Sequence, residues 1–279
     1  MRLGGFVIHG NSQKTLARCL DSLVAVCDEV LAVDSDSNDG SRQLCLARGV
    51  RSLTYSWQGP GAARSAAAVA LGHCDYLFFL DADEWLEPDG VAALRRWRGG
   101  ASGLPHYTVR RRDWVDTGGR RFLFRCETRA RVVRRDCATW QPSWIVHEAL
   151  PHRKAASLGM FVEHAFATSP TLLRDKQAPY AFLWAIRANA AGRQPTSGFG
   201  RALASTLRDS VVKGALWRGG ADGWRMARAV AHYHGLKYEY LRAIHAGAYR
   251  VAVEAFAAGR YAELFDMIRS GPPALPGVV

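Results

Sequence analysis

The sequence lacks any apolar run long enough to cross a bilayer. Its longest stretches without a charged side chain end after about a dozen residues, whereas a transmembrane helix needs about 20 apolar residues. Residues 1–11 also lack the apolar core and the small-residue cleavage site of a secretory signal. We therefore expect a cytoplasmic protein whose first residues form a strand.

Cysteine spacings typical of metal sites or disulfide frameworks are also missing. The six cysteines include no CxxC pair, so we expect reduced, buried thiols. His147, Glu148 and His152 form HExxxH rather than the HExxH of zinc proteases, and Pro151 disfavours a helix there. The sequence therefore does not predict a zinc site.

Acidic residues are scarce outside the first third of the chain. The formal charge is +12, yet residues 1–90 hold 7 basic and 12 acidic side chains, and residues 91–279 hold 30 basic and 13 acidic ones. Such a balance is one mark of a nucleic-acid binder. Here the basic residues are scattered, and no nucleic-acid signature accompanies them, so we expect no nucleic-acid partner. An anionic lipid surface or a bound diphosphate are the alternatives.

The first hundred residues alternate between apolar strands and amphipathic helices. Strands that are apolar throughout indicate a mostly parallel sheet covered on both faces. We predict strands near 3–9, 30–33, 50–55 and 76–80, and helices from about 12, 41, 62 and 88. The expected fold class is α/β, an open mixed sheet with helices on both faces.

The pattern changes after residue 104. Segments 107–112, 122–124 and 131–134 are typical of strands, and we expect residues 104–165 to complete a mixed sheet. From Pro170 the chain becomes helical, with predicted helices near 171–191, 199–217 and 222–246 and two shorter ones within 248–268. We expect the helix near 171–191 to be kinked or to start late, because it contains Pro179. The sequence therefore predicts a catalytic-type α/β domain over residues 1–168 and a helical C-terminal extension over residues 169–279.

Polar residues follow three of the predicted strands at the point where each ends. They are Asn11, Asp34 and the pair Asp81/Asp83. In open α/β sheets, ligands bind beyond the carboxyl ends of the strands. We therefore predict the ligand site at this edge.

Asp81-Ala82-Asp83 follows the fourth strand directly. Two carboxylates at positions i and i+2 on a turn can both face the edge of the sheet. Mg²⁺ is usually held by one or two carboxylates together with substrate phosphates. We predict that Asp83 ligates Mg²⁺ or Mn²⁺ bridging a diphosphate, while Asp81 meets a ribose or the metal's water.

Four motifs in this order resemble those of family 2 glycosyltransferases, most closely the lipopolysaccharide core β-1,4-glucosyltransferase-like branch. They are residues 33–41 (VDSDSNDGS), 61–66 (GAARSA), 80–84 (LDADE) and 146–148 (VHE). Residues 222–225 (DGWR) and 236–238 (LKY) are similar to the helical tail of that branch. The first loop departs from the family, with His9-Gly10-Asn11-Ser12 in place of the usual threonine-lysine-asparagine-glutamate, and Ala248–Val279 has no clear counterpart.

The resemblance implies a GT-A fold, a sugar donor linked to a nucleoside diphosphate (most often UDP), a divalent cation and inversion at the anomeric carbon. It divides the catalytic domain into a nucleotide-sugar half, residues 1–98, and an acceptor half, residues 99–168. It places Asn11, Asp34 and Ser35 near the nucleoside. Arg64 is implied near the base or the diphosphate, and Asp81 and Asp83 match the metal and diphosphate motif.

The same resemblance assigns His147 and Glu148 to the acceptor side. A single displacement needs one carboxylate to take the proton of the attacking hydroxyl, and we predict Glu148 for this role. Asp116 and Asp113 are competing candidates for the base. Trp140 and Trp144 flank this region, either as core residues or as platforms for a sugar, and we place Trp144 with Asp116 on the acceptor side.

The leading hypothesis is therefore an inverting glycosyltransferase that moves a hexose from a UDP-sugar to a hydroxyl. The acceptor is a glycolipid, a carbohydrate or a small molecule, and the resemblance favours lipopolysaccharide core. An acceptor that is a secondary metabolite or a protein stays open, as does peripheral association with the inner membrane. A non-catalytic module that binds a nucleotide sugar or an anionic membrane surface is the alternative from another class.

Overall fold

The computed structural model describes residues 1–100, 103–147, 149–150 and 155–276. Glu148, predicted as the base, lies outside the described residues, as do 101–102, 151–154 and 277–279. The strands are β1 (Leu3–His9), β2 (Glu29–Asp34), β3 (Arg51–Thr54), β4 (Tyr76–Asp81), β5 (Glu84–Trp85), β6 (His106–Asp116), β7 (Arg121–Arg134) and β8 (Ala155–Ala167). The helices are α1 (Gln13–Val26), α2 (Ser41–Ala47), α3 (Pro60–Ala70), α4 (Pro88–Gly99), α5 (Pro170–Ala190), α6 (Gly198–Leu207), α7 (Ala215–His245), α8 (Arg250–Ala257) and α9 (Tyr261–Met267). A 3₁₀ turn covers Arg135–Cys137, and a π-helical turn covers Arg208–Val212.

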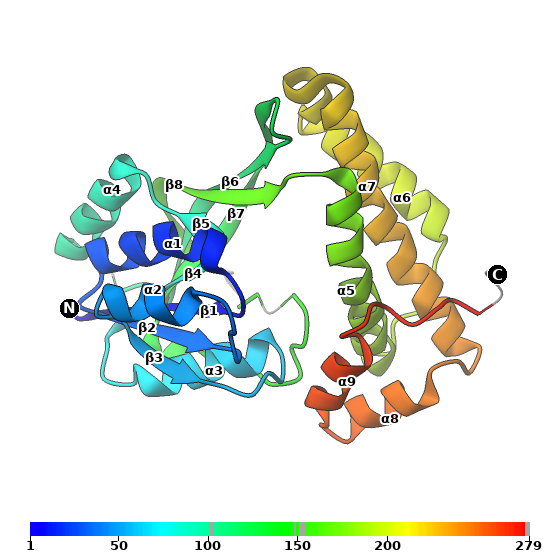
Figure 1. Ribbon diagram of the computed structural model, residues 1–279, viewed down its shortest axis with the longest axis horizontal. Coiled ribbons are helices and arrows are strands. Elements are labelled where there is room, and N and C mark those ends of the chain that lie inside the picture. The colour runs from blue at the N-terminus through cyan, green and yellow to red at the C-terminus, as the bar shows by residue number, and fades with distance from the viewer. Residues whose placement is uncertain (101–102, 148, 151–154, 277–279) are drawn as a thin grey trace. The chain divides into compact units, whose positions relative to one another are not determined.

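The described strands form one mixed sheet in the order β3-β2-β1-β4-β7-β6-β8-β5. The first four strands in this order run parallel, and β7 joins β4 antiparallel. Parallel neighbours require crossover connections, which α1, α2 and α3 supply between successive strands. The expected fold class, an open mixed sheet with helices and a helical C-terminal part, is confirmed (Figure 1).

Both faces of β1 are buried, because successive side chains of a strand point to opposite faces. Val7 belongs to the apolar cluster that includes Leu16 and Leu20 of α1. Phe6 instead stacks on Phe79 with ring centroids 5.4 Å apart, and Trp140 packs edge-on against both rings. Trp140 is 4% exposed, so of its two predicted roles it fills the core one.

The chain divides into two compact units. Unit 1 contains Met1–Asp113, Cys126–Gln141 and the described residues of 148–166, and unit 2 contains Trp114–Arg125, Pro142–His147 and the described residues from Ala167. The domain boundary at residue 168 stays a prediction. So does the division of the first domain into a nucleotide-sugar half and an acceptor half. Unit 2 has its own apolar core, built mainly from α5 and α7 with the two short C-terminal helices.

Several predicted elements differ from the structure in their bounds. The strands expected at 122–124 and 131–134 are one continuous strand, β7. The helix expected at 199–217 ends at Leu207 and passes into the π-helical turn, and Gly214 (φ 74°) then precedes α7. Of the two alternatives for the helix near 171–191, a kink or a late start, the late start is wrong, because Ser169 caps the first turn of α5 and Pro179 lies within the helix.

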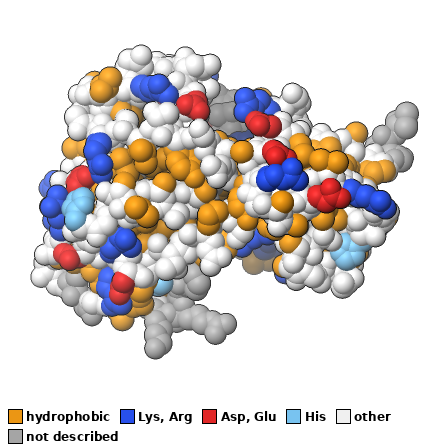
Figure 2. Space-filling view, turned by 90° about the horizontal axis from the view of Figure 1, so that it is seen from below, with side chains coloured by type: hydrophobic (Ala, Val, Ile, Leu, Met, Phe, Trp, Pro, Cys, Tyr) orange, Lys and Arg blue, Asp and Glu red, His pale blue; other side chains and the backbone are white. Residues whose placement is uncertain are grey.

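Charged side chains of opposite sign lie close together over much of the surface. Figure 2 shows Lys and Arg interspersed with Asp and Glu on the face in view. Arg98, for example, donates to Asp28 at 2.8 Å, and Arg48 donates to Asp21 at 2.6 Å. Among the described residues, no helix combines the length and the apolar character that crossing a membrane requires.

Candidate functional site

The carboxyl ends of β2 and β4 lie at the same edge of the sheet in unit 1. In the strand register His9 of β1 pairs with Asp34, and Ile8 pairs with Asp81. The structure therefore brings Asp34 and Asp81 to one edge, on either side of β1. Asn11 follows β1 at this edge in the left-handed region, with φ 49°.

The loop after β2 is tied to the loop after β1 by hydrogen bonds. Ser37 Oγ accepts from the Asn11 backbone N–H at 3.0 Å, and the Asn11 side-chain oxygen accepts from the Asn38 backbone N–H at 2.9 Å. Ser35 donates its backbone N–H to the carbonyl of His9 at 2.8 Å. The three predicted nucleoside contacts at this end, Asn11, Asp34 and Ser35, therefore share one rigid loop pair.

Asp34 is 1% exposed and lies beneath this loop pair. Its carboxylate accepts from the Ser37 backbone N–H at 3.1 Å and from Arg42 Nε at 2.5 Å. Burial acts to raise the pKa of Asp34, but the hydrogen bonds from Ser37 and Arg42 outweigh burial and lower it. The result is a buried anion at the end of β2.

Two arginines hold Asp81 at the end of β4. Arg64 of α3 donates to Oδ1 at 2.6 Å, and Arg131 of β7 donates to Oδ2 at 2.8 Å. Burial acts to raise the pKa of Asp81, but the charges of Arg131 and Arg64 hold it far below its usual range. Arg64, expected near the base or the diphosphate, thus forms a direct ion pair with Asp81, and its contact with a ligand stays a prediction.

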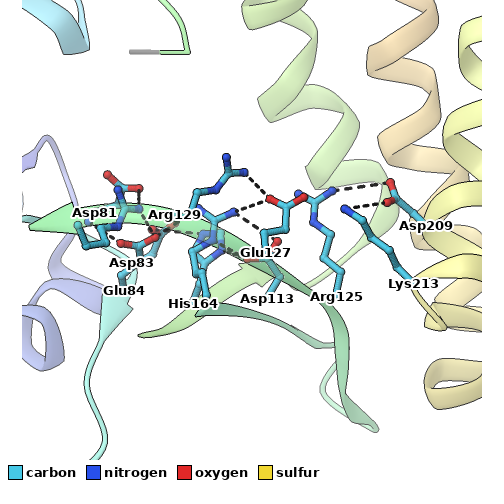
Figure 3. Close-up of polar contacts among 12 residues, drawn as sticks. Asp81, Asp83, Glu84, Asp113, Arg125, Glu127, Arg129, His164, Asp209 and Lys213 are labelled. Carbon is cyan, nitrogen blue, oxygen red and sulfur yellow. Dashed lines mark hydrogen bonds and ion pairs between the residues drawn. The ribbon is translucent and has the colours of Figure 1, made fainter. Parts of the chain in front are cut away.

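The turn after Asp81 places Asp83 beside a histidine. β5 pairs antiparallel with β8, with Glu84 opposite His164, and the Ala165 backbone N–H donates to the Asp83 carbonyl at 2.9 Å. His164 Nε2 lies 3.5 Å from Asp83 Oδ1 (Figure 3). On its other side, His164 Nδ1 lies 2.7 Å from Asp113 Oδ1. Burial lowers the pKa of His164, but Asp83 and Asp113 together raise it to about 9.

A layer of alternating charges lies beneath the turn. Glu84 is fully buried and accepts from Arg131 and, at 3.3 Å, from Arg111 of β6. Arg111 also donates from Nε to Asp113 at 2.8 Å. A buried charge is tolerated when it is paired and hydrogen-bonded. This network therefore fixes the positions of Asp81 and His164 before any ligand binds.

Sequence reasoning missed His164, Arg131 and Arg111. The one local signal for His164 is the polar pair Glu163-His164 inside the apolar run of β8. Arg131 and Arg111 each lie in a segment with an ordinary strand pattern, so no local feature of the sequence marks them as site residues. Their roles come from strand pairing between segments about 30 to 80 residues apart along the chain.

The Asp83–His164 pair has the chemistry of a divalent-metal site. A carboxylate and a neutral imidazole at 3.5 Å can both ligate one ion, so a cation bound here would displace the Nε2 proton that the raised pKa of His164 otherwise keeps in place. Asp113 orients the ring as outer partners of metal-bound histidines do. One oxygen and one nitrogen donor suit Mn²⁺ better than Mg²⁺, which prefers oxygen ligands. Both oxygens of Asp81 already accept from arginines, so Asp83 and His164 fit the metal better than the predicted Asp81/Asp83 pair.

Among the described residues, three possible metal donors lie together elsewhere, at Glu29, His73 and Cys74. Glu29 begins β2, at the opposite end of the strand from Asp34. Its carboxylate also pairs with Arg2, at 3.3 Å, and with Arg51, at 2.9 Å. These partners account for the cluster as a surface ion-pair group.

The predicted acceptor-side residues that the structure describes all lie in unit 2. His147 has φ 54° and its Nε2 lies 2.7 Å from the hydroxyl of Tyr233. Trp144 has the guanidinium of Arg187 5.9 Å from its ring centre. Asp116 ends β6 and accepts from the Gly118 backbone N–H at 3.0 Å. Their acceptor roles stay predictions, as does that of Glu148.

Comparison with known proteins points to one family for the first third of the chain. Residues 6–99 match the model of glycosyl transferase family 2. The matched segment contains the Asp34 loop, Arg64 and the Asp81-Ala82-Asp83 turn. The family match therefore covers β1 to β5 with the turn after β4, and it stops before β6, β7 and β8.

Two curated relatives match the chain over a similar length. Uncharacterized glycosyltransferases from Rickettsia felis and Rickettsia typhi are 30% and 27% identical over 88 residues, or 32% of this chain. The chain spans about three tenths of the length of these relatives (31% and 30%). Neither supports the narrower lipopolysaccharide core branch.

The chain is also similar, at a lower level, to a solved structure. Glucosyl-3-phosphoglycerate synthase from Mycobacterium tuberculosis, in complex with Mn²⁺ and UDP-glucose, has a TM-score of 0.42 and 15% identity. The likeness covers 70% of this chain and 81% of that one.

Proposed function

We propose that this chain is a glycosyltransferase that moves a sugar from a UDP-sugar to an acceptor hydroxyl with the help of Mn²⁺ or Mg²⁺. The observation that carries the proposal is the turn after β4, where the carboxylate of Asp83 faces His164 at the ligand-binding edge of the sheet. The family 2 match over residues 6–99 supports it, because that segment contains this turn.

In this proposal Asp83 and His164 hold the cation. When bound, the cation neutralises the charge that develops on the leaving diphosphate, so no general acid is needed. Arg64 and Arg131 keep Asp81 ionised and fixed, ready to meet the ribose or a metal-bound water. Asn11, Asp34 and Ser35 form the nucleoside end, where hydrogen bonds join the two loops.

The reaction is proposed to invert the anomeric centre, with Glu148 as the general base and His147 beside it. The base removes the proton of the attacking hydroxyl, a role that needs a carboxylate within hydrogen-bond reach of the acceptor. Asp113 is unsuited to this role, because it is fully buried and bonded to Arg111 and His164. Asp116 remains the second candidate for the base.

The finer points rest on the resemblance of the motifs alone. We propose a hexose as the transferred sugar, a lipopolysaccharide core sugar as the acceptor, and a site of action at the cytoplasmic side of the inner membrane. Asp116 and Trp144 are proposed to meet the acceptor.

The test is release of UDP from a panel of UDP-glucose, UDP-galactose and UDP-N-acetylglucosamine, with Mn²⁺ and with EDTA. We expect release that depends on the metal and falls at least 100-fold in Asp83→Asn. Asp89→Asn, an exposed carboxylate in the first turn of α4, is the matched control and should keep full activity. Metal-independent release, or equal activity of Asp83→Asn and Asp89→Asn, would refute the proposal.

A further inference from the structure

A basic pocket lies within unit 2, between α5, α6 and α7. Its volume is about 310 Å³. α6 and α7 approach closely beside it. A Cβ on Gly198 would lie only 2.9 Å from the carbonyl oxygen of Gly235. The lining of the pocket comes from these helices and the segments next to them, and α5 and α6 both pack against α7.

Four cations line this pocket: Arg193, Arg201, Arg208 and Lys237. Of these, Arg208 pairs with a carboxylate, that of Asp209, at 2.8 Å. In the part of the chain that the structure describes, Arg193, Arg201 and Lys237 form no ion pair with a carboxylate. Three positive charges at this pocket therefore have no carboxylate that neutralises them.

Lys237 is the most unusual of the four. It is 8% exposed, and among the described residues its ammonium group has neither a hydrogen-bond acceptor nor an acidic partner. Burial, followed by the charges of Arg193, Arg208 and Arg201, lowers the pKa of Lys237 to about 8. Burial of most of this side chain makes its positive charge costly, and an anionic partner would lower that cost.

Aromatic rings, rather than acids, hold these cations in place. The ammonium of Lys237 lies 4.5 Å from the ring centre of Trp184 and 4.8 Å from that of Tyr233. The guanidinium of Arg193 also faces Trp184, at 5.4 Å, and that of Arg201 faces the Tyr238 ring at 5.2 Å. Cation–π contacts hold a cation without using its N–H donors. Arg193 Nη1 donates to the Tyr238 hydroxyl and Arg201 Nε to Thr196 Oγ1, each at 3.4 Å. The remaining donors of these two arginines and the ammonium of Lys237 are available to an anion.

We propose that this pocket binds the phosphate group of a phosphomonoester or diphosphate ligand. A carboxylate brings one negative charge, whereas a phosphomonoester brings about 1.5 to 2 at neutral pH and several acceptor oxygens, which better matches three uncompensated cations. Guanidinium forks suit phosphate oxygens in particular. The pocket volume is near the lower end for small-molecule sites, about 300 Å³, and so accepts a compact phosphorylated group.

Binding at this pocket can be tested apart from the proposed sugar transfer. All of its residues lie in unit 2, whereas Asp83 and His164 lie in unit 1. Binding can therefore be measured without donor sugar or metal, and its result does not depend on whether the chain is an enzyme.

The test is titration calorimetry of the full chain with inorganic pyrophosphate and with glycerol 3-phosphate, in EDTA. We expect saturable binding that weakens at least tenfold in Lys237→Gln and in Arg201→Gln. Arg228→Gln, an exposed cation of α7 outside the pocket, should stay within twofold of the unmodified chain. Circular dichroism and thermal unfolding of each variant separate loss of binding from loss of fold.

A second arm distinguishes a free ligand from a lipid headgroup. Phosphatidylcholine vesicles containing phosphatidic acid, a phosphomonoester, are compared with vesicles containing phosphatidylglycerol, a phosphodiester. Phosphatidic acid binding that Lys237→Gln abolishes identifies the lipid as a source, and soluble binding without vesicle binding identifies a free metabolite; both support the site. No binding of either soluble probe or of phosphatidic acid vesicles, or binding that Lys237→Gln and Arg228→Gln leave equally intact, would overturn the proposal.

Discussion

Replacing Lys237 by methionine is expected to stabilise the protein. The pKa of Lys237 falls from 10.5 to about 8 in the folded state, and a shift of one unit corresponds to about 1.4 kcal/mol. Below pH 8 the buried charge therefore costs about 3 kcal/mol. Methionine has a similar length and no charge, but it loses two cation–π contacts, worth about 0.5–1 kcal/mol each. The free energy of unfolding should rise by about 1–2 kcal/mol at pH 7.

This gain should depend on pH in a defined direction. Because the pKa of Lys237 is lower in the folded state than in the unfolded chain, the unfolded chain holds more protons between about pH 8 and 10.5. The stability of the unmodified protein therefore rises with pH through this window as Lys237 loses its proton. The advantage of Lys237→Met should be full below pH 8 and should shrink toward pH 10.5.

The assay is urea unfolding of both proteins at pH 7, 8, 9 and 10, followed by circular dichroism. Other titrating groups are shared, so they cancel in the difference between the two proteins. With only five lysines in the chain, ¹³C-labelled lysine can also report the pKa of Lys237 directly by NMR.

Lys213→Met is the matched control, because Lys213 has an acidic partner. Its ammonium lies 3.6 Å from Asp209 Oδ1, so its loss should leave stability unchanged or lower it. The reasoning is refuted if Lys237→Met destabilises the protein at pH 7, if the difference between proteins is the same at every pH, or if NMR gives Lys237 a pKa near 10.5.

Three further predictions concern the site in unit 1. Glu84→Gln removes a buried charge shared by Arg131 and Arg111, and should lower the free energy of unfolding by about 2–3 kcal/mol in urea denaturation; an unchanged midpoint would contradict the network. His164→Gln should weaken Mn²⁺ binding by about 10- to 100-fold in calorimetry, and equal affinity would exclude the ring as a ligand. Glu148→Gln should lower transfer by about 10²- to 10⁴-fold while binding UDP normally, and full transfer activity would assign the base elsewhere.

The sequence predicts the first four strands of the sheet because the residues that indicate each strand are neighbours in the chain. Each is an apolar run that ends at a polar turn, and helices with apolar faces separate them. The place of Asp81 at the carboxyl end of β4 follows from the same pattern. The proximity of Asp34 to the same edge follows from the parallel connection of β1, β2 and β4.

The long antiparallel strands were harder to foresee. β7 has charged residues at intervals that interrupt its apolar pattern, including Arg125, Glu127, Arg129 and Arg131. In a sequence, charged residues that interrupt an apolar run usually indicate a turn or a loop instead of a strand. Here several of them pair within the network at the edge of the sheet, so burial of complementary charges replaces the usual alternation of apolar and polar side chains.

The sequence by itself determined the alternating α/β start, the helical end and the acidic turn after the fourth strand, because these features are recorded in neighbouring residues. Only the tertiary structure decided that His164 faces Asp83, that Arg64 and Arg131 share Asp81, and that Lys237 meets aromatic rings instead of an acid. Each of these contacts joins side chains that are distant in the chain. Their electrostatic effects depend on burial and on separation in space, which no local pattern specifies.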